Sequence, residues 1–241
     1  MNDWIVPDWP APAKVRALVT TRAGGVSRGP YATMNLATHV GDDAAAVAEN
    51  RRRLRAHLPD EPLWLSQVHG NGVVRAEEAG EGAEADAAFT RRAGCVCAVL
   101  TADCLPVLLC NDAGTVVCAA HAGWRGLAGG VLEAALRASN EPPARMLAWL
   151  GPAIGPRAFE VGPGVRDAFL DHSAEATTAF APKANGKWLA DLYRLATQRL
   201  NALGVSHVFG GERCTFREAD SFYSYRRERN TGRMASLIWM E

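Results

Sequence analysis

The stretch from Cys95 to Gly126 constrains the fold more than any other part of this sequence. It contains three near-continuous apolar runs, at residues 95–100, 105–110 and 115–120. Each run has the length of a strand and is apolar on both faces, which is typical of strands in a sheet that is covered on both sides. Polar groups occur only where the runs stop, so the sequence predicts that Asp103, Cys104 and His121 lie at strand ends.

Length and charge narrow the classes of protein that this chain can belong to. With 241 residues, 48% of them hydrophobic, the chain can bury a full core, and we predict one domain that spans residues 1–241. Lysine plus arginine equals aspartate plus glutamate at 26 each, so no global field favours nucleic acid or an anionic membrane. Any anion must therefore be bound by a local group of side chains.

The sequence carries no sign of export or membrane insertion. The first ten residues, MNDWIVPDWP, lack the basic start and apolar core of a signal peptide. No run approaches the roughly 18 apolar residues that a membrane span needs. We therefore expect a cytoplasmic protein whose six cysteines are reduced thiols.

Periodicity predicts further elements on both sides of the central stretch. Apolar alternation or short apolar runs predict strands at residues 14–21, 63–68, 86–91, 146–150, 203–209 and 235–240. Helical spacing predicts helices at residues 44–57, from 126 to about 138, at 163–171 and at 188–201.

Three metal-capable residues share one setting in this pattern. His69, Cys104 and His121 each close a predicted strand and open a loop. Two imidazoles and one thiolate leave a fourth position free, which is the ligand set of a catalytic zinc site. The same residues also allow a cysteine hydrolase, with Cys104 as nucleophile and His121 as base, or histidines that only bond loop carbonyls. Among the other histidines, His39 alone lies in a loop-rich setting from which it could join the site.

Arginines beside glycines or aromatic residues are candidates for binding an anion. Arg22 precedes a pair of glycines, and Arg125 lies near a predicted helix N-terminus. Arg226 belongs to the segment FYSYRR at 222–227, which could stack on a base or grip a phosphate. The simpler alternative is an amphipathic rim whose arginines point into solvent.

Eight motifs together resemble one known family. They are TTRAGGVS at 20–27, GPYATMNLATHVGDD at 29–43, WLSQVHG at 64–70, TADCLPVLL at 101–109, AAHAGWRGL at 119–127, WLGPAIGP at 149–156, FEVG at 159–162 and FYSYRRERNTGRMASLIW at 222–239. This set resembles the multicopper polyphenol oxidase or laccase-domain family, also called purine nucleoside phosphorylase-like or peptidoglycan editing factor proteins. The resemblance covers nearly the whole chain.

The resemblance implies a fold, a metal and an activity. The implied fold is α+β, a single-domain sandwich of mixed β-sheets flanked by helices and related to bacterial toxin cysteine hydrolases. The implied metal is zinc, with copper as the alternative, on the histidine of QVHG (His69), the cysteine of TADC (Cys104) and the histidine of HAGWRG (His121). The implied reactions are phosphorolysis of adenosine, inosine and methylthioadenosine, and deamination of adenosine.

Within that activity we expect definite roles for a small set of residues. The expected catalytic residues are Cys104, His121 and Asp103, and the expected substrate or phosphate ligands are Arg22, Arg125, Arg226, Asn35 and Gln67. The expected partners are purine nucleosides and phosphate, with no nucleic acid and no membrane, and the protein is expected to be a monomer or weak homodimer. The alternatives are a cysteine hydrolase or peptidoglycan-precursor editing factor that acts on UDP-muramoyl peptides, and a non-catalytic factor that binds nucleotide sugars.

The laccase name can be tested against the sequence. A true laccase binds a blue copper and a three-copper cluster, which need many imidazoles. Six histidines, with no His-x-His pair, are too few for that set. The sequence therefore predicts a mononuclear site.

Overall fold

The computed structural model describes residues 3–241, and its strands form three sheets. The largest has, in spatial order, β12 (His207–Gly210), β8 (Met146–Leu150), β6 (Leu105–Asn111), β7 (Val117–Ala122), β4 (Ala87–Thr90) and β3 (Val73–Arg75). The second has β1 (Val15–Val19), β13 (Met234–Met240), β5 (Val96–Thr101) and β2 (Pro62–Leu63). The smallest has β10 (Phe180–Pro182), β11 (Trp188–Ala190) and β9 (Glu160–Val161).

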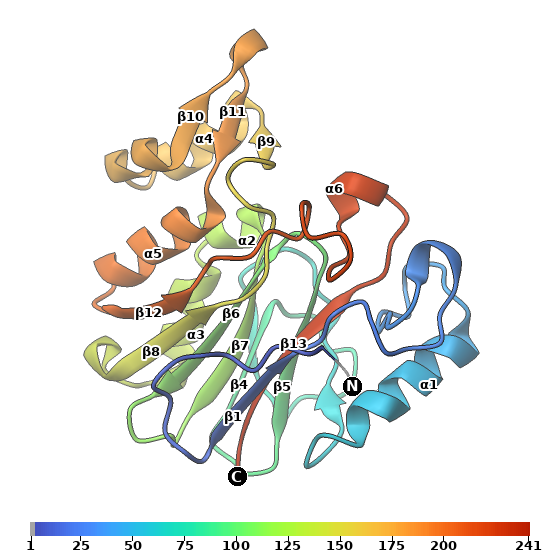
Figure 1. Cartoon of the computed structure of the whole chain (residues 1–241). Helices are drawn as coiled ribbons and strands as arrows, with labels where there is room; N and C mark the ends of the chain where they lie inside the picture. Colours follow the sequence, from blue (N-terminus) through green and yellow to red (C-terminus); the bar gives the residue numbers. More distant parts are fainter. Residues whose placement is uncertain (1–2) are drawn as a thin grey trace.

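Helices cover the outer faces of the two larger sheets. The α-helices are α1 (Ala44–Arg55), α2 (Trp124–Ala128), α3 (Val131–Ser139), α4 (Pro163–Leu170), α5 (Leu192–Ala202) and α6 (Tyr225–Glu228). Short 3₁₀ helices lie at Gly29–Tyr31, Pro143–Arg145, Ala174–Ala179 and Ala184–Gly186. Figure 1 shows α1 on one side of the paired sheets, α3 and α5 on the other, and the three-stranded sheet with α4 at the top.

Burial on both faces explains the continuous apolar runs. In β6, Leu108 and Cys110 pack between the two large sheets, while Val107 and Leu109 pack against the helices. Side chains alternate between the two faces of a strand, so a strand with both faces buried must be apolar at every position. β5 and β7 follow the same rule, and all their residues are buried.

Most predicted elements are present, with shifts of one or two residues at their ends, although the strand expected at 203–209 begins only at His207. The three central runs form β5, β6 and β7. His121, expected to follow the third run, lies within β7 and pairs with Pro106 of β6. The mixed sheets and flanking helices agree with the expected α+β sandwich. The likeness to cysteine hydrolases stays a prediction.

Three predicted elements are wrong in part. The strand expected at 63–68 ends at Leu63, after which only Ser66 forms an isolated bridge, with Glu84. The helix expected from 126 to 138 is divided into α2 and α3, because Gly130 adopts a φ of 89° between them. The first residues of the helix expected at 188–201 form β11, which pairs with β10 and β9.

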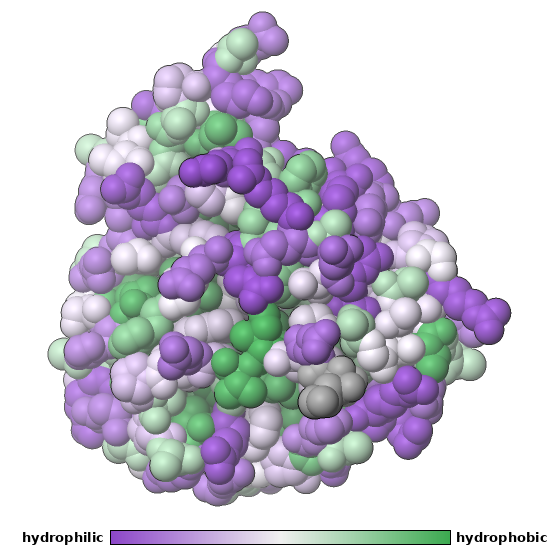
Figure 2. Space-filling view, viewed as in Figure 1, coloured by the Kyte–Doolittle hydropathy of each residue, from purple (hydrophilic) through white to green (hydrophobic). Residues whose placement is uncertain are grey.

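The visible surface is largely polar. Figure 2 shows hydrophilic side chains over much of the visible face. Within the described residues, no helix has the length and apolar character that crossing a membrane requires. All six cysteines are free thiols, as expected.

Candidate metal centre

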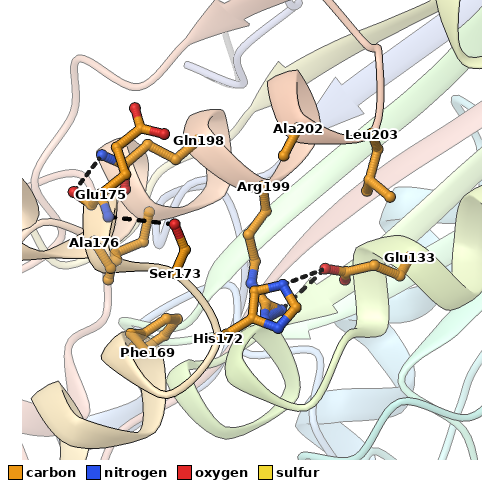
Figure 3. A pocket seen from close by; sticks show the side chains of 11 residues that line it. Glu133, Phe169, His172, Ser173, Glu175, Ala176, Gln198, Arg199, Ala202 and Leu203 are labelled. Carbon is orange, nitrogen blue, oxygen red and sulfur yellow. Dashed lines mark hydrogen bonds and ion pairs between the residues drawn. The ribbon is translucent and has the colours of Figure 1, made fainter.

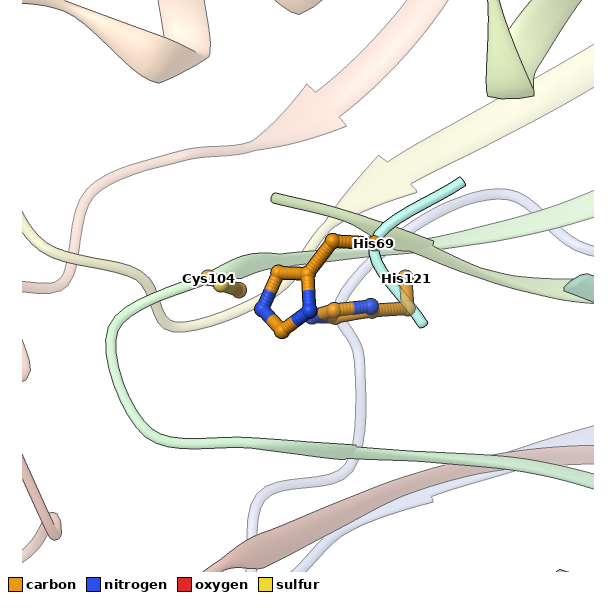
Figure 4. Close-up of side chains that lie close together, drawn as sticks. All are labelled: His69, Cys104 and His121. Carbon is orange, nitrogen blue, oxygen red and sulfur yellow. The ribbon is translucent and has the colours of Figure 1, made fainter. Parts of the chain in front are cut away.

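His69, Cys104 and His121 come together at one end of the sandwich (Figure 4). One ligand atom from each side chain lies within 4.8 Å of the other two. The imidazoles of His69 and His121 meet edge to face, with ring centroids 4.8 Å apart. His121 is buried, Cys104 is half-buried and His69 is exposed, so the cluster is anchored on one side and open on the other.

Strand register explains why Cys104 lies beside His121. β6 and β7 are antiparallel, and their ladder pairs Leu105 with Ala122 and Pro106 with His121. Cys104 directly precedes Leu105, so the ladder places it next to the end of β7. The hairpin between the two strands is at the opposite end, so the cluster forms where β6 begins and β7 ends.

The turn that carries Cys104 passes from one sheet to the other. β5 belongs to the four-stranded sheet and β6 to the six-stranded sheet, so residues 102–104 cross between them. Asp103 has a φ of 92°, a conformation that costs a non-glycine residue free energy and that occurs often at functional sites. His69 also has a positive φ, of 61°. Two strained residues therefore lie at the cluster or next to it.

Asp86 is the buried carboxylate that orients both histidines. Its Oδ1 lies 2.7 Å from Nδ1 of His121 and accepts the backbone N–H of His69 at 3.0 Å. Its Oδ2 accepts the backbone N–H of Gly70 at 2.6 Å. Burial raises the pKa of Asp86, but the hydrogen bonds from His121 and Gly70 outweigh it, and the net pKa is lowered. Asp86 is therefore a carboxylate that fixes the ring of one ligand and the backbone of the other.

The thiol and the imidazole of the cluster shift each other's pKa. Burial opposes ionisation of Cys104, but the charge and hydrogen bond of His121, with help from His69, lower the pKa of the thiol. Burial likewise opposes the charge on His121, while Cys104 and Asp86 raise its pKa. The cluster thus favours a thiolate, which is the form of cysteine that binds a metal and the form that attacks as a nucleophile.

The donor set fits zinc. The Nδ1 of His121 is occupied by Asp86, which leaves Nε2 for an ion, as in carboxylate–histidine–zinc arrangements. Two imidazole nitrogens and a thiolate suit zinc or copper, and a fourth position stays open toward the cavity. Gly123 permits this approach, because a Cβ there would lie 2.9 Å from Sγ of Cys104 and 3.2 Å from Cδ2 of His69.

The cluster opens into a cavity of about 600 Å³. Aromatic side chains of Trp124, Phe159 and Tyr225 line it. Its arginines are Arg125, Arg226 and Arg233. A cavity of this size, with rings, cations and a metal-capable cluster, suits a small polar ligand that has a flat apolar part.

Asp103, on the turn of the TADC motif, and Arg226, in the C-terminal segment, both line this cavity. Both carboxylate oxygens of Asp103 accept hydrogen bonds at 2.6 Å, one from the Thr215 hydroxyl and one from the backbone N–H of Arg226. The guanidinium of Arg226 donates to the carbonyl of Glu160 and lies over the ring of Phe159. Asp103 therefore fixes α6 to the rim of the cavity.

Arg125 and Gln67 also line the cavity, but Arg125 stacks on a ring whereas Gln67 is held by two hydrogen bonds to the backbone. The guanidinium of Arg125 lies over the ring of Trp124 with its carbon 4.5 Å from the centroid. The amide of Gln67 donates to the carbonyl of Leu100 and accepts its N–H, as a strand neighbour would. Gln67 therefore replaces the backbone pairing that the predicted strand at 63–68 would have made.

The structure does not bring Arg22 and Asn35 to the cavity wall. The guanidinium of Arg22 donates to the carbonyls of Ala32 and Ala219 and lies over the ring of Tyr223. Asn35 is fully buried, and its Oδ1 accepts the backbone N–H of Arg233 at 2.9 Å. Both side chains hold loops in place, so any effect on a ligand is indirect.

Sequence reasoning missed two residues of the site. Asp86 is buried and directly precedes the buried strand β4, and an acid in such a setting is a signal for a paired carboxylate. Arg233 precedes β13, and nothing in its sequence context distinguishes it from the other arginines nearby. His39, which the sequence picked out among the other histidines, does line the cavity.

A second cavity, of about 350 Å³, lies among α3, α4 and α5 (Figure 3). The buried Arg199 pairs there with the half-buried Glu133, since Nη1 of Arg199 lies 3.1 Å from Oε1 of Glu133. Arg199 also donates to the carbonyls of Leu127 and Ala128 at the end of α2. This network ties three helices together.

A mixed α/β fold with a His–Cys–His cluster in an open cavity defines a protein with a candidate mononuclear metal centre. Within residues 3–241 this is the one such group of three or more ligands. The chain belongs to the multi-copper polyphenol oxidoreductase laccase family, whose model matches residues 16–241.

Relatives of known name and solved structures match over nearly their full length. A purine nucleoside phosphorylase of Pseudomonas aeruginosa is 57% identical over 242 residues, and the purine nucleoside phosphorylase YfiH of Escherichia coli is 54% identical over 243 residues. Both alignments cover 100% of each chain. A Neisseria meningitidis protein superposes with a TM-score of 0.96 at 53% identity, covering 99% of both chains. YlmD from Geobacillus stearothermophilus has a TM-score of 0.92 at 33% identity, covering 99% of this chain and 96% of its own.

Proposed function

We propose that this protein is a purine nucleoside phosphorylase that cleaves adenosine, inosine and methylthioadenosine with inorganic phosphate, and that it also deaminates adenosine. The observation that carries the proposal is the full-length identity, 57% and 54%, to two proteins named purine nucleoside phosphorylases. The proposed cofactor is zinc, with copper as the alternative, on the three residues of the cluster.

The cavity supports a nucleoside as substrate. Its volume of about 600 Å³ lies within the range of roughly 300–1,000 Å³ that small-molecule sites occupy. The rings of Trp124, Phe159 and Tyr225 offer apolar faces for a purine. The guanidinium groups of Arg125 and Arg226 offer donors for the phosphate or ribose oxygens.

In phosphorolysis, an oxygen of phosphate bonds to C1′ of the ribose and the bond from C1′ to the purine breaks. The electron pair leaves with the purine, which takes up a proton, and the products are free base and ribose 1-phosphate. Zinc held by His69, Cys104 and His121 would supply a Lewis acid. Asp86 keeps His121 oriented throughout. In deamination, the oxygen of a water bonds to C6 of the purine, the bond from C6 to the amino nitrogen breaks, and ammonia leaves. We propose Asp103 as the group that carries the proton from the water to the leaving amine, because its carboxylate lines the cavity and is held in place by two short hydrogen bonds.

A nucleoside panel with and without phosphate tests the proposal. We expect phosphate-dependent release of base from inosine, phosphate-independent deamination of adenosine, and loss of both reactions in Cys104→Ala. Cys214→Ala is the matched control, because Cys214 is also a half-buried free thiol but does not line the cavity. Wild-type protein that carries zinc yet releases no base in phosphate would overturn the assignment.

One observation favours a second candidate, a cysteine hydrolase that acts on muropeptide precursors. Asp86, His121 and Cys104 follow one another in the order acid, imidazole, thiol, and the thiol has a lowered pKa. In that reaction His69 has no role. Rapid inactivation of untreated protein by iodoacetamide, with no effect of a chelator, would favour the hydrolase, whereas inactivation by chelator and recovery with zinc would favour the metalloenzyme.

A further inference from the structure

Within the described residues, Arg233 places a guanidinium that pairs with no carboxylate in the cavity beside the cluster. It directly precedes β13, whose first residue, Met234, pairs with Thr101 at the end of β5. This register sets Arg233 beside the turn at residues 102–104 that carries Cys104. Arg233 lines the same cavity as the cluster and is half-buried.

The hydrogen bonds of Arg233 use only part of its donors. Its Nη1 donates to the carbonyls of Thr231 and Gly232, at 2.9 and 3.0 Å. Across residues 3–241, its Nε and Nη2 donate to no acceptor, and no carboxylate forms an ion pair with it within 4.0 Å. Neither nitrogen is sealed from solvent. The Nε–Nη2 edge, which is the edge of arginine that matches two oxygens of a carboxylate or phosphate, is therefore free for a ligand.

Burial and nearby negative charge act on the pKa of Arg233 in opposite directions. Burial lowers the pKa of Arg233, and the negative charges of Cys104 and Asp103 act in the opposite direction. Arginine stays charged at any physiological pH, so its Nε and Nη2, which donate to no acceptor within residues 3–241, can form charge-assisted hydrogen bonds with an anion. The other two cavity arginines lie over the rings of Trp124 and Phe159.

His39 faces the same space. Its partial burial lowers its pKa, and the positive charge of Arg233 lowers it further. A neutral imidazole can donate one N–H, so the two side chains could bind one anion together. Asn35 supports the arrangement, because its Oδ1 accepts the backbone N–H of Arg233.

We propose that Arg233 binds the phosphate co-substrate through Nε and Nη2, with His39 as a second donor. The identity of the anion rests on the proposed phosphorolysis, whereas the anion site itself rests on the geometry. Asn35 is then a positioning residue that acts through the backbone of Arg233.

Calorimetric titration of inorganic phosphate into the purified full-length protein tests the site without catalysis. A bidentate, charge-assisted contact contributes about 1.5–3 kcal/mol, so Arg233→Gln should weaken phosphate binding at least about tenfold. Arg233→Lys keeps the charge and loses the fork, and should fall between the two. Arg16→Gln is the control for loss of one positive charge, since Arg16 pairs with Glu241 on the surface outside the cavity, and it should bind phosphate as the wild type does.

Steady-state phosphorolysis separates this inference from the proposed function. We expect Arg233→Gln to raise the KM for phosphate at least about tenfold while the KM for inosine changes less than about twofold. Equal phosphate affinity in wild type and Arg233→Gln would overturn the inference and leave phosphorolysis intact. Phosphate binding that depends on Arg233, in a protein that cleaves no nucleoside, would refute phosphorolysis and retain the anion site. If Arg233→Gln melts early, Arg233→Lys and His39→Gln decide, and unchanged phosphate affinity in both overturns the inference.

Discussion

Replacing Asp86 by asparagine tests whether one buried carboxylate organises the metal centre. Asp86 is fully buried and accepts bonds from Nδ1 of His121 and from the backbone N–H groups of His69 and Gly70. An asparagine side chain has one oxygen and one NH₂ group in the same space. Its NH₂ group must therefore face either the His121 ring and the His69 N–H or the loop at Gly70, and the donors on that side lose their acceptor.

The structure gives the size of the expected effect. A hydrogen bond to a charged group contributes about 1.5–3 kcal/mol, which corresponds to roughly 10–150-fold in an equilibrium constant. Carboxylates that orient a metal-bound histidine typically change metal affinity about 10–100-fold when they are replaced. We therefore predict that Asp86→Asn binds zinc about 10–100-fold more weakly than the wild type.

Competition between the protein and a chromogenic chelator measures this affinity. Asp112→Asn is the control, because Asp112 pairs with Arg145 on the surface, and its zinc affinity should equal that of the wild type. Thermal melting confirms that both variants are folded. Zinc affinity within about twofold of the wild type in folded Asp86→Asn would refute the orienting role.

Three further predictions follow from contacts around the site. Gly123→Ala should lower zinc affinity, because its Cβ would lie 2.9 Å from Sγ of Cys104, whereas Gly162→Ala, whose Cβ meets nothing within 4 Å, should not. Arg22→Leu should reduce the free energy of unfolding by about 2–3 kcal/mol in denaturant titrations, since two backbone carbonyls lose a charged donor, and should leave the KM for phosphate unchanged. In protein freed of metal by a chelator, the rate at which iodoacetamide modifies Cys104 should already be near its plateau at pH 7, because the thiol pKa is lowered. The rate should decline only as the pH falls through that pKa. A rate that still rises steeply above pH 8 would contradict the influence of His121 on the thiol.

The central strands could be predicted from sequence because both of their faces are buried. A run of consecutive apolar side chains as short as residues 105–110 of β6 predicts a strand, because it is too short for a typical buried helix. The segment at 63–68 shows the limit, since its apolar alternation predicts a strand, but the side chain of Gln67 takes the place of backbone pairing with Leu100. Whether residues 188–190 join a helix or a strand depends on β10, a partner that lies earlier in the chain and that periodicity does not identify.

The residues of the candidate site that lie at the ends of apolar runs could be predicted from the sequence. His69, Cys104 and His121 could be found because each ends or begins an apolar run, and the structure brings them together. Asp86 and Arg233 depend on which strands pair, since Asp86 reaches His121 through the β4–β7 ladder and Arg233 reaches the turn through the β13–β5 ladder. A single sequence does not specify those pairings.

Elemental analysis of the purified protein tests the central claim most directly. The account predicts about one zinc ion per chain in the wild type and in the control Cys214→Ala, because three ligands with an open fourth position bind a single ion. It predicts loss of zinc in folded His69→Ala, Cys104→Ala and His121→Ala, since each removes one ligand of the cluster. Full zinc content in Cys104→Ala would contradict the assignment of the metal centre.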